Sequence, residues 1–122
     1  NMMKEIVAYC EETGQGTPDV LGEMAIAISN GLTEEYRKSI KYMEEITGKT
    51  VSCINMVGGG IQDELLCELT AKATGKRVMA GPTEGSVLGN SIVQFVASGA
   101  VGSVQEGREI IRNSFEVKVY EP

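Results

Sequence analysis

The sequence contains no histidine, no apolar run approaching the ~18 residues of a membrane span and no excess of basic side chains. Without histidine, the chain cannot form a histidine-based catalytic triad, a two-histidine zinc site or an imidazole pH switch. The N-terminus lacks a charged-then-apolar signal pattern, so we expect neither export nor membrane insertion. With 11 basic and 17 acidic residues, the net charge is −6, which argues against a nucleic-acid partner.

A chain of 122 residues is the size of one domain and can bury one core. Two lobes with a cleft between them would need more chain. The three cysteines, Cys10, Cys53 and Cys67, match neither a metal motif nor a redox pair. We interpret them as small, buried thiols of a reduced, cytoplasmic protein.

The first half of the chain is predicted to be helical. Apolar residues at helical spacing indicate a short helix over residues 3–10 that stops before Gly14. The order Thr, Pro, Asp at 17–19 is typical of a helix start and predicts a long helix from there to Gly48. The apolar stripe expected to face the core consists of Leu21, Met24, Ile28, Leu32, Tyr36, Ile40, Met43 and Ile46.

The second half changes to strand patterns. Residues 51–57 (VSCINMV) are apolar on both faces, as in a buried parallel strand. A helical stripe at 65–73 that ends at Gly75, followed by a strand at 77–80, completes a predicted βαβ unit with a right-handed crossover. Three further elements are expected: a helix at 83–98, a short helix from Ser103 and a strand at 115–120. The fold class is therefore α/β.

A glycine loop (Gly58, Gly59 and Gly60) separates the first strand from the following helix. Residues without Cβ let a ligand lie against the backbone, and the helix start offers free amides. A nucleotide is therefore the ligand that we expect here. The dinucleotide fingerprint GxGxxG fails here because Asp63 stands in place of the third glycine, and the Walker lysine is absent. The alternative is that the glycines only make a tight turn.

The residues around this loop form an ordered series of motifs. MVGGGIQDELL at 56–66 is followed by LTA at 69–71, TGKRV at 74–78, AGPTE at 80–84 and LGN at 88–90. This succession resembles the FGGY family of carbohydrate kinases over nearly the whole chain. Within that family it is most similar to the members that phosphorylate L-rhamnulose.

The resemblance implies an actin-like, ribonuclease-H-like fold with helices packed on a small, mostly parallel sheet. It also implies transfer of the γ-phosphoryl group of ATP to the 1-hydroxyl of L-rhamnulose, with Mg²⁺. In the family the glycine loop borders the adenosine, and Gly59 is the first choice for direct contact. Asp63 stands near the adenine where the family usually has Asn, and an ionised carboxylate cannot donate a hydrogen bond. Its alternative role is to start the helix.

The resemblance further implies which parts are absent. The base aspartate, the phosphate-binding hairpin and most sugar contacts lie upstream in the family, so we expect residues 1–122 to be a C-terminal fragment of the nucleotide-side domain. Catalytic and metal-ligating residues are not expected in it, and its partners would be ATP or ADP and a sugar held mainly upstream. Two alternatives stay open: a kinase for xylulose, fuculose or glycerol, or a stand-alone, non-catalytic binding module.

Three charged residues near the motifs receive structural interpretations. Glu84 occupies the first turn of a predicted helix, so we expect it to cap that helix. Lys76 and Arg77 lie between the predicted helix at 65–73 and the next strand, where we expect a solvated turn.

Overall fold

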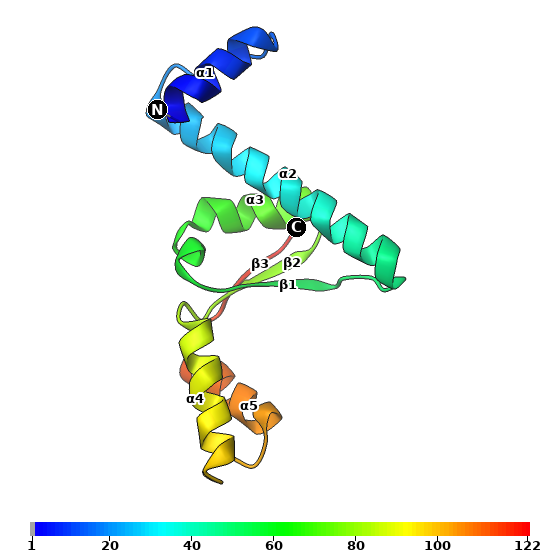
Figure 1. Cartoon of the computed structure of the whole chain (residues 1–122), viewed down its shortest axis with the longest axis vertical. Helices are drawn as coiled ribbons and strands as arrows, with labels where there is room; N and C mark the ends of the chain where they lie inside the picture. Colours follow the sequence, from blue (N-terminus) through cyan, green and yellow to red (C-terminus); the bar gives the residue numbers. More distant parts are fainter. Residues whose placement is uncertain (1) are drawn as a thin grey trace.

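A computed structural model describes residues 2–122 of the chain (Figure 1). The elements in chain order are α1 (Met2–Glu12), α2 (Leu21–Thr47), β1 (Cys53–Met56), the 3-10 turn η1 (Gly59–Gln62), α3 (Glu64–Thr74), β2 (Arg77–Ala80), α4 (Gly85–Ala97), α5 (Val104–Ser114) and β3 (Lys118–Tyr120). Each helix and strand expected from the sequence is present in that order. The α/β class is therefore confirmed, and the differences concern element ends and burial.

The sheet has the strand order β1-β2-β3. β1 and β2 are parallel, with Ile54 opposite Val78, and α3 connects them, which confirms the predicted βαβ unit. β2 and β3 are antiparallel, with Met79 opposite Val119, so the sheet is mixed. Only Lys118–Tyr120 of the expected strand at 115–120 pairs with β2, and Phe115 lies outside it as an exposed side chain.

The core lies between α3 and one face of the sheet. Cys67 and Ala71 of α3 and Val78 of β2 are fully buried there. Because side chains alternate along a strand, Ile54 and Ala80 reach the same core while their neighbours face away. This compact contact, rather than the flanking helices, fixes the position of the glycine loop.

α2 begins later than the sequence predicts. Val20, not Thr17, is its N-cap, and Val20 has extended backbone and makes no side-chain cap hydrogen bond. Glu23 instead holds the chain just before the helix, since its carboxylate accepts a hydrogen bond from the Asp19 N–H at 2.8 Å. The predicted end is right: Gly48 adopts φ 65° and closes the helix.

The apolar stripe of α2 is only partly buried. Met24 and Ile40 are in the core, the small residues Ser29 and Thr33 are buried as well, and α2 packs against α3. Several large members of the stripe remain exposed: Leu21, Leu32, Tyr36, Met43 and Ile46. The expectation that the whole stripe faces the core is wrong for these residues, because α3 touches a neighbouring face of the helix.

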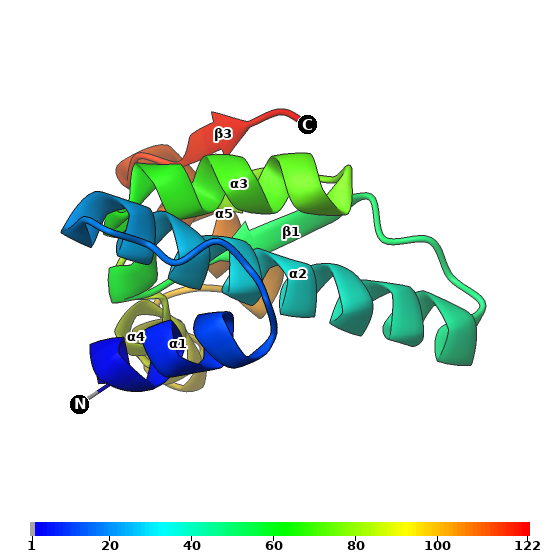
Figure 2. The same ribbon diagram turned by 90° about the horizontal axis from the view of Figure 1, so that it is seen from above.

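α4 and α5 lie on the other side of the sheet from α2 and α3 (Figures 1 and 2). Ile92 is the buried side chain of α4, whereas Val93 and Phe95 are exposed. A Cβ at Gly85 would lie 3.1 Å from the Val57 side chain, so a larger residue there would require the half-exposed Val57 to shift. Ser103 caps α5 by accepting a hydrogen bond from the Glu106 N–H, as predicted.

Candidate functional site

The glycine loop follows β1 directly and turns into η1. Gly58 has a backbone φ of 87°, a conformation that residues with a Cβ rarely adopt. Its carbonyl accepts a hydrogen bond from the Ile61 N–H at 3.3 Å, and the Gly60 carbonyl accepts one from the Asp63 N–H at 3.2 Å. The tight-turn interpretation therefore explains the glycine at position 58.

Gly59 and Gly60 have no such explanation within the described residues. Both are exposed, neither has a positive φ, and a Cβ built on either would meet no atom within 4 Å. The backbone of the loop thus faces open space, with room for a ligand directly against it.

Asp63 is the N-cap of α3. Its carboxylate accepts a hydrogen bond from the Leu66 N–H at 3.0 Å, which satisfies one of the free amides at the helix start. The helix-start role weighed for this residue is therefore confirmed. A carboxylate engaged in this way leaves the remaining free amides of the first turn close to a negative charge.

The loop that follows β2 lies beside the glycine loop. The Gly81 N–H donates a hydrogen bond to the Met56 carbonyl at 2.9 Å, so the carboxyl ends of the two parallel strands meet. Ligands of open α/β sheets bind at this end of the strands. A hollow of about 260 Å³ opens here, lined by Ile61, Gln62, Glu64, Ala80, Thr83, Glu116 and Lys118.

Sequence reasoning did not single out Ile61 or Thr83 as lining residues. The signal was available, since Ile61 directly follows the glycine loop and Thr83 lies within the AGPTE motif. The glycines themselves and Asp63 are not in the lining of this hollow, which lies next to them rather than over them.

The charges around this hollow are mostly acidic. Lys118 forms an ion pair with Glu64, which raises the pKa of the lysine. Burial, together with Asp63 and Glu64, raises the pKa of the Cys67 thiol. Cys67 is therefore an inert core thiol, as predicted, whereas Cys10 and Cys53 are only partly buried, so the prediction of buried thiols is wrong for these two. The acidic surroundings of the start of α3 suit an uncharged part of a ligand better than a phosphate.

Glu84 lies at the N-cap position of α4 but makes no side-chain cap hydrogen bond, so the capping role expected for it is not found. Arg77, the first residue of β2, is exposed and forms an ion pair with Glu121, which follows β3. Within residues 2–122 there is no cluster of three or more acidic or cysteine side chains that could hold a metal ion. The same residues include no helix that is both long and apolar enough to cross a membrane.

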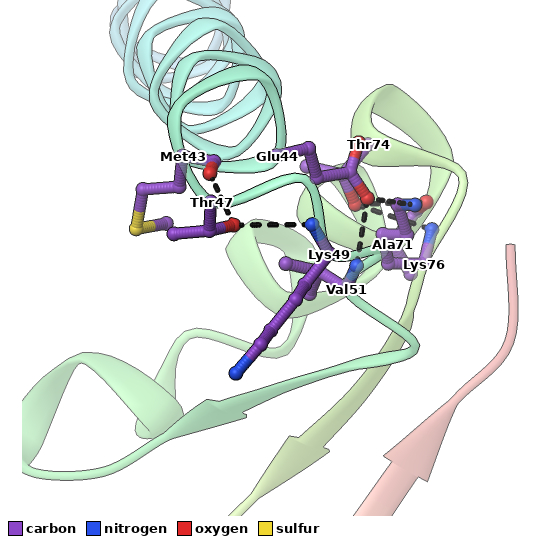
Figure 3. A network of polar contacts seen from close by, with 8 residues as sticks. All are labelled: Met43, Glu44, Thr47, Lys49, Val51, Ala71, Thr74 and Lys76. Carbon is purple, nitrogen blue, oxygen red and sulfur yellow. Dashed lines mark hydrogen bonds and ion pairs between the residues drawn. The ribbon is translucent and has the colours of Figure 1, made fainter.

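Glu44 joins three segments at the opposite ends of the strands (Figure 3). Its carboxylate accepts hydrogen bonds from the Val51 N–H at 2.7 Å and from the Lys76 ammonium at 2.8 Å. These two donors lower the pKa of Glu44. Lys76 is thus half-buried in an ion pair that ties α2 to the start of β2, and the expected solvated turn is wrong for this residue.

Comparison with known proteins supplies the family. The C-terminal domain of the FGGY family of carbohydrate kinases matches residues 2–98. A rhamnulokinase of Halalkalibacterium halodurans is 43% identical over 98% of the chain, which covers 26% of that relative. Rhamnulokinases of Bacillus subtilis and Ligilactobacillus salivarius are each 41% identical over the whole chain, which covers 25% of either.

The chain spans about a quarter of the length of these curated relatives. The family resemblance predicted from the motifs is confirmed, and the helix-rich layers on a small mixed sheet are consistent with a C-terminal domain of the actin-like ATPase fold. The chain belongs to the FGGY family of carbohydrate kinases.

Proposed function

We propose that residues 1–122 form the C-terminal, nucleotide-side part of a sugar kinase that uses ATP and Mg²⁺ to phosphorylate L-rhamnulose on its 1-hydroxyl. The observation that carries the nucleotide role is the open space against Gly59 and Gly60, for which packing within the described chain gives no reason. Rhamnulokinase is the name of each of the three relatives described above, which favours L-rhamnulose over other sugars.

In this proposal the glycine loop (Gly58, Gly59 and Gly60) holds the adenosine. The loop offers close backbone approach, and the neighbouring hollow offers the apolar side chains of Ile61 and Ala80. Asp63 and Glu64 make phosphate binding at this point unfavourable, so the triphosphate extends away from the start of α3. Asp63 supports the loop by capping the helix.

ATP supplies the phosphoryl group when it is bound, and Mg²⁺ neutralises its charge. The residues of this chain would bind and orient the nucleotide, while the base for the sugar hydroxyl and the metal ligands come from outside it. The chain on its own is therefore expected to phosphorylate L-rhamnulose no faster than background.

A chimera tests the proposal. The aligned quarter of Bacillus subtilis rhamnulokinase is replaced by this chain, and ATP-dependent phosphorylation of L-rhamnulose is measured. An active chimera is expected, and a folded chimera without ATP binding would overturn the nucleotide role. The sugar is tested on the endogenous full-length protein, because most sugar contacts are expected upstream of this chain, and a preference for L-fuculose, D-xylulose or glycerol would overturn the assignment of substrate.

Gly59→Val in the chimera tests the loop itself. We expect the KM for ATP to rise by about ten-fold or more, with the KM for the sugar unchanged, because the new side chain fills the space of the nucleotide. Gly16→Val is the matched control, since Gly16 also lies in open space without a positive φ. Equal KM values for ATP in the two variants would argue against contact at Gly59.

A stand-alone binding module is the second candidate. It is favoured by a hollow of about 820 Å³ between the sheet and the helices α4 and α5, which Gly85, Leu88 and Gly89 help to line. The intact mass of the endogenous protein separates the two proposals. A mass several times 13.1 kDa supports the kinase domain, whereas a native mass near 13.1 kDa favours the module.

A further inference from the structure

A hollow of about 820 Å³ lies between the sheet and the helices α4 and α5, on the side of the sheet away from α2 and α3 (Figure 1). Its volume falls within the range of about 300–1,000 Å³ that is usual for small-ligand pockets. Neither the glycine loop (Gly58, Gly59 and Gly60) nor Asp63 lines it. It is therefore a second candidate pocket, separate from the site proposed for the adenosine.

The walls of this hollow are mainly apolar. Met79 and Val119 lie opposite each other on neighbouring strands and line it from the sheet. Leu88 of α4 and Ile111 of α5 line it from the helices, and Asn55 of β1 is the one uncharged polar side chain in the lining. Walls of this kind favour a ligand with an apolar body, because contact with them removes apolar surface from water.

Arg108 and Arg112 bring positive charge to this apolar hollow. They are four residues apart on α5, so their side chains leave the same face of the helix. No acidic residue is among those that line the hollow in the described chain. Within residues 2–122 neither guanidinium has a hydrogen-bond or ion-pair partner. Both are thus available to an anion.

The other two arginines of the sequence are both paired with carboxylates. Arg37 donates two hydrogen bonds to Glu34, and Arg77 forms an ion pair with Glu121. In a chain with 17 acidic and 11 basic residues, two neighbouring arginines without a carboxylate are an exception. The end of the helix favours a cation at Arg112, but it gives no reason for a second one a turn earlier.

The two arginines match a phosphate monoester in geometry and in charge. A guanidinium presents its N–H donors in a planar fork that fits two phosphate oxygens at once. A phosphate monoester carries a charge of about −1.5 to −2 near pH 7, so it balances both arginines, whereas a carboxylate balances only one. The rest of the molecule would then lie on the apolar walls at Met79, Leu88 and Ile111.

We infer that this hollow is a binding site for a small organic phosphate monoester. Arg108 and Arg112 hold the phosphate, and an apolar body lies against the sheet. A nucleic acid is not the occupant, because the net charge of −6 repels a polyanion. Such a site is compatible with a kinase domain and with a stand-alone module alike, so it does not depend on the proposed function.

Isothermal titration calorimetry of the endogenous full-length protein tests the site with octyl phosphate as the probe. We expect octyl phosphate to bind at least about ten-fold more tightly than inorganic phosphate or 1-octanol, because neither of these combines an anion with an apolar body. Equal affinities for octyl phosphate and 1-octanol would overturn the inference. An absence of octyl phosphate binding would also overturn it, since another part of the protein would then close the hollow.

Charge variants of the same protein locate the phosphate. Arg108→Gln and Arg112→Gln should each weaken octyl phosphate binding by about ten-fold or more, because each removes charge-assisted hydrogen bonds. Arg77→Gln is the matched control, since it removes the same charge from an exposed arginine outside the hollow. Its effect should stay within about two-fold, because salt screens distant surface charges. Equal losses in all three folded variants would mean general attraction by charge and would contradict the site.

A second pair of variants locates the apolar body. Gly89 lines the hollow, and Gly31 lies on α2 outside it. No atom lies within 4 Å of a Cβ added at either glycine, and leucine favours a helix over glycine, so both Gly89→Leu and Gly31→Leu should fold. Only Gly89→Leu should abolish octyl phosphate binding, because its side chain fills the hollow. Unchanged binding to Gly89→Leu would place the probe elsewhere and overturn the inference.

Competition with ATP separates this hollow from the nucleotide site. We expect saturating ATP to leave the affinity for octyl phosphate unchanged, because the glycine loop does not line the hollow. Displacement of octyl phosphate by ATP would show that the hollow belongs to the nucleotide site and would overturn the inference. A protein that binds octyl phosphate but not ATP would instead refute the proposed nucleotide role alone.

Discussion

The βαβ unit and the pair of helices α4 and α5 are both rich in apolar residues, but they bury them to very different extents. Val78 of β2 and Ala71 of α3 are fully buried, whereas Val93 of α4 is 55% exposed. The difference follows from connectivity, because the crossover of a βαβ unit folds its helix back onto its own strands. α4 and α5 have mainly each other to pack against, and one small contact between two helices cannot cover all their apolar faces.

The comparison has a consequence for the candidate site. The glycine loop (Gly58, Gly59 and Gly60) is attached at both ends to the well-packed unit, through β1 and through the capped start of α3. Its backbone can therefore hold one conformation even though the surrounding helices have exposed apolar faces. A site that must meet a ligand with preformed geometry belongs on such a support.

The largest expected effect comes from removing the same two methyl groups in each region. Val78→Ala creates a cavity in the core and should lower the free energy of unfolding by about 2 kcal/mol or more. Val93→Ala should change it by less than about 0.5 kcal/mol, since the side chain is mostly in water and alanine favours the helix. Urea unfolding of the chain, followed by circular dichroism, measures both values.

Equal losses of stability in these two variants would contradict the difference in packing, because they would mean that α4 is packed as tightly as β2. The same two variants are also measured in the chimera, where α4 has the rest of the enzyme beside it. A larger cost of Val93→Ala there than in the isolated chain would show that the rest of the kinase covers α4.

An intermediate effect is expected where α4 and α5 touch. A Cβ at Gly107 would lie 2.3 Å from Cγ2 of Ile92, a side chain that is itself buried, so Gly107→Ala should destabilise the chain by about 1–2 kcal/mol. Gly89→Ala is the control within the same helix pair. No atom lies within 4 Å of its added Cβ, and alanine should stabilise α4 by up to about 1 kcal/mol.

Opposite signs for the two glycine variants in urea unfolding would confirm that one tight contact holds these helices together. A neutral Gly107→Ala would mean that Ile92 can move aside and that the pair is looser than its geometry suggests.

Local signals in the sequence predicted the elements well. Gly48 and Gly75 both adopt the left-handed conformation that ends a helix, and Asp63 caps α3 through its own side chain. Such features depend on a few neighbouring residues, so spacing alone reveals them. The start of α2 was predicted wrongly at Thr17, because the chain stays non-helical up to the N-cap Val20 and the Glu23 carboxylate holds Asp19 outside the helix.

Burial was predicted less well than the elements. Leu32 and Ile46 have the right spacing for a core face, yet they are 43% and 66% exposed. A periodic apolar stripe indicates which helix face is suited to burial, but it does not indicate which element will bury it. The site shows the same limit: Gly59 and Asp63 could be named from the motif, whereas the neighbouring hollow at Ile61 depends on how two loops meet in space.

The smallest expected effect concerns Glu44, which connects α2 to the βαβ unit. Since Lys76 and the Val51 N–H lower the pKa of Glu44 in the folded chain, its contribution to stability is present above the unfolded-state pKa. That contribution is lost as the pH falls through the lower, folded-state pKa. We therefore expect Glu44→Gln to lower the Tm by about 1–3 °C at pH 7 and to flatten the decline of Tm between about pH 5 and pH 3.

Glu45→Gln is the control for this prediction, because it removes the same charge from an exposed side chain that makes no hydrogen bond or ion pair in the described part of the chain. Thermal unfolding at several pH values compares both variants with the parent chain. If Glu44→Gln retained the full acid-dependent decline and Glu45→Gln did not, the coupling between α2 and the βαβ unit would run through another contact. A loss confined to Glu44→Gln would instead show that this half-buried carboxylate adds to the packing of α2 against α3 in joining α2 to the βαβ unit.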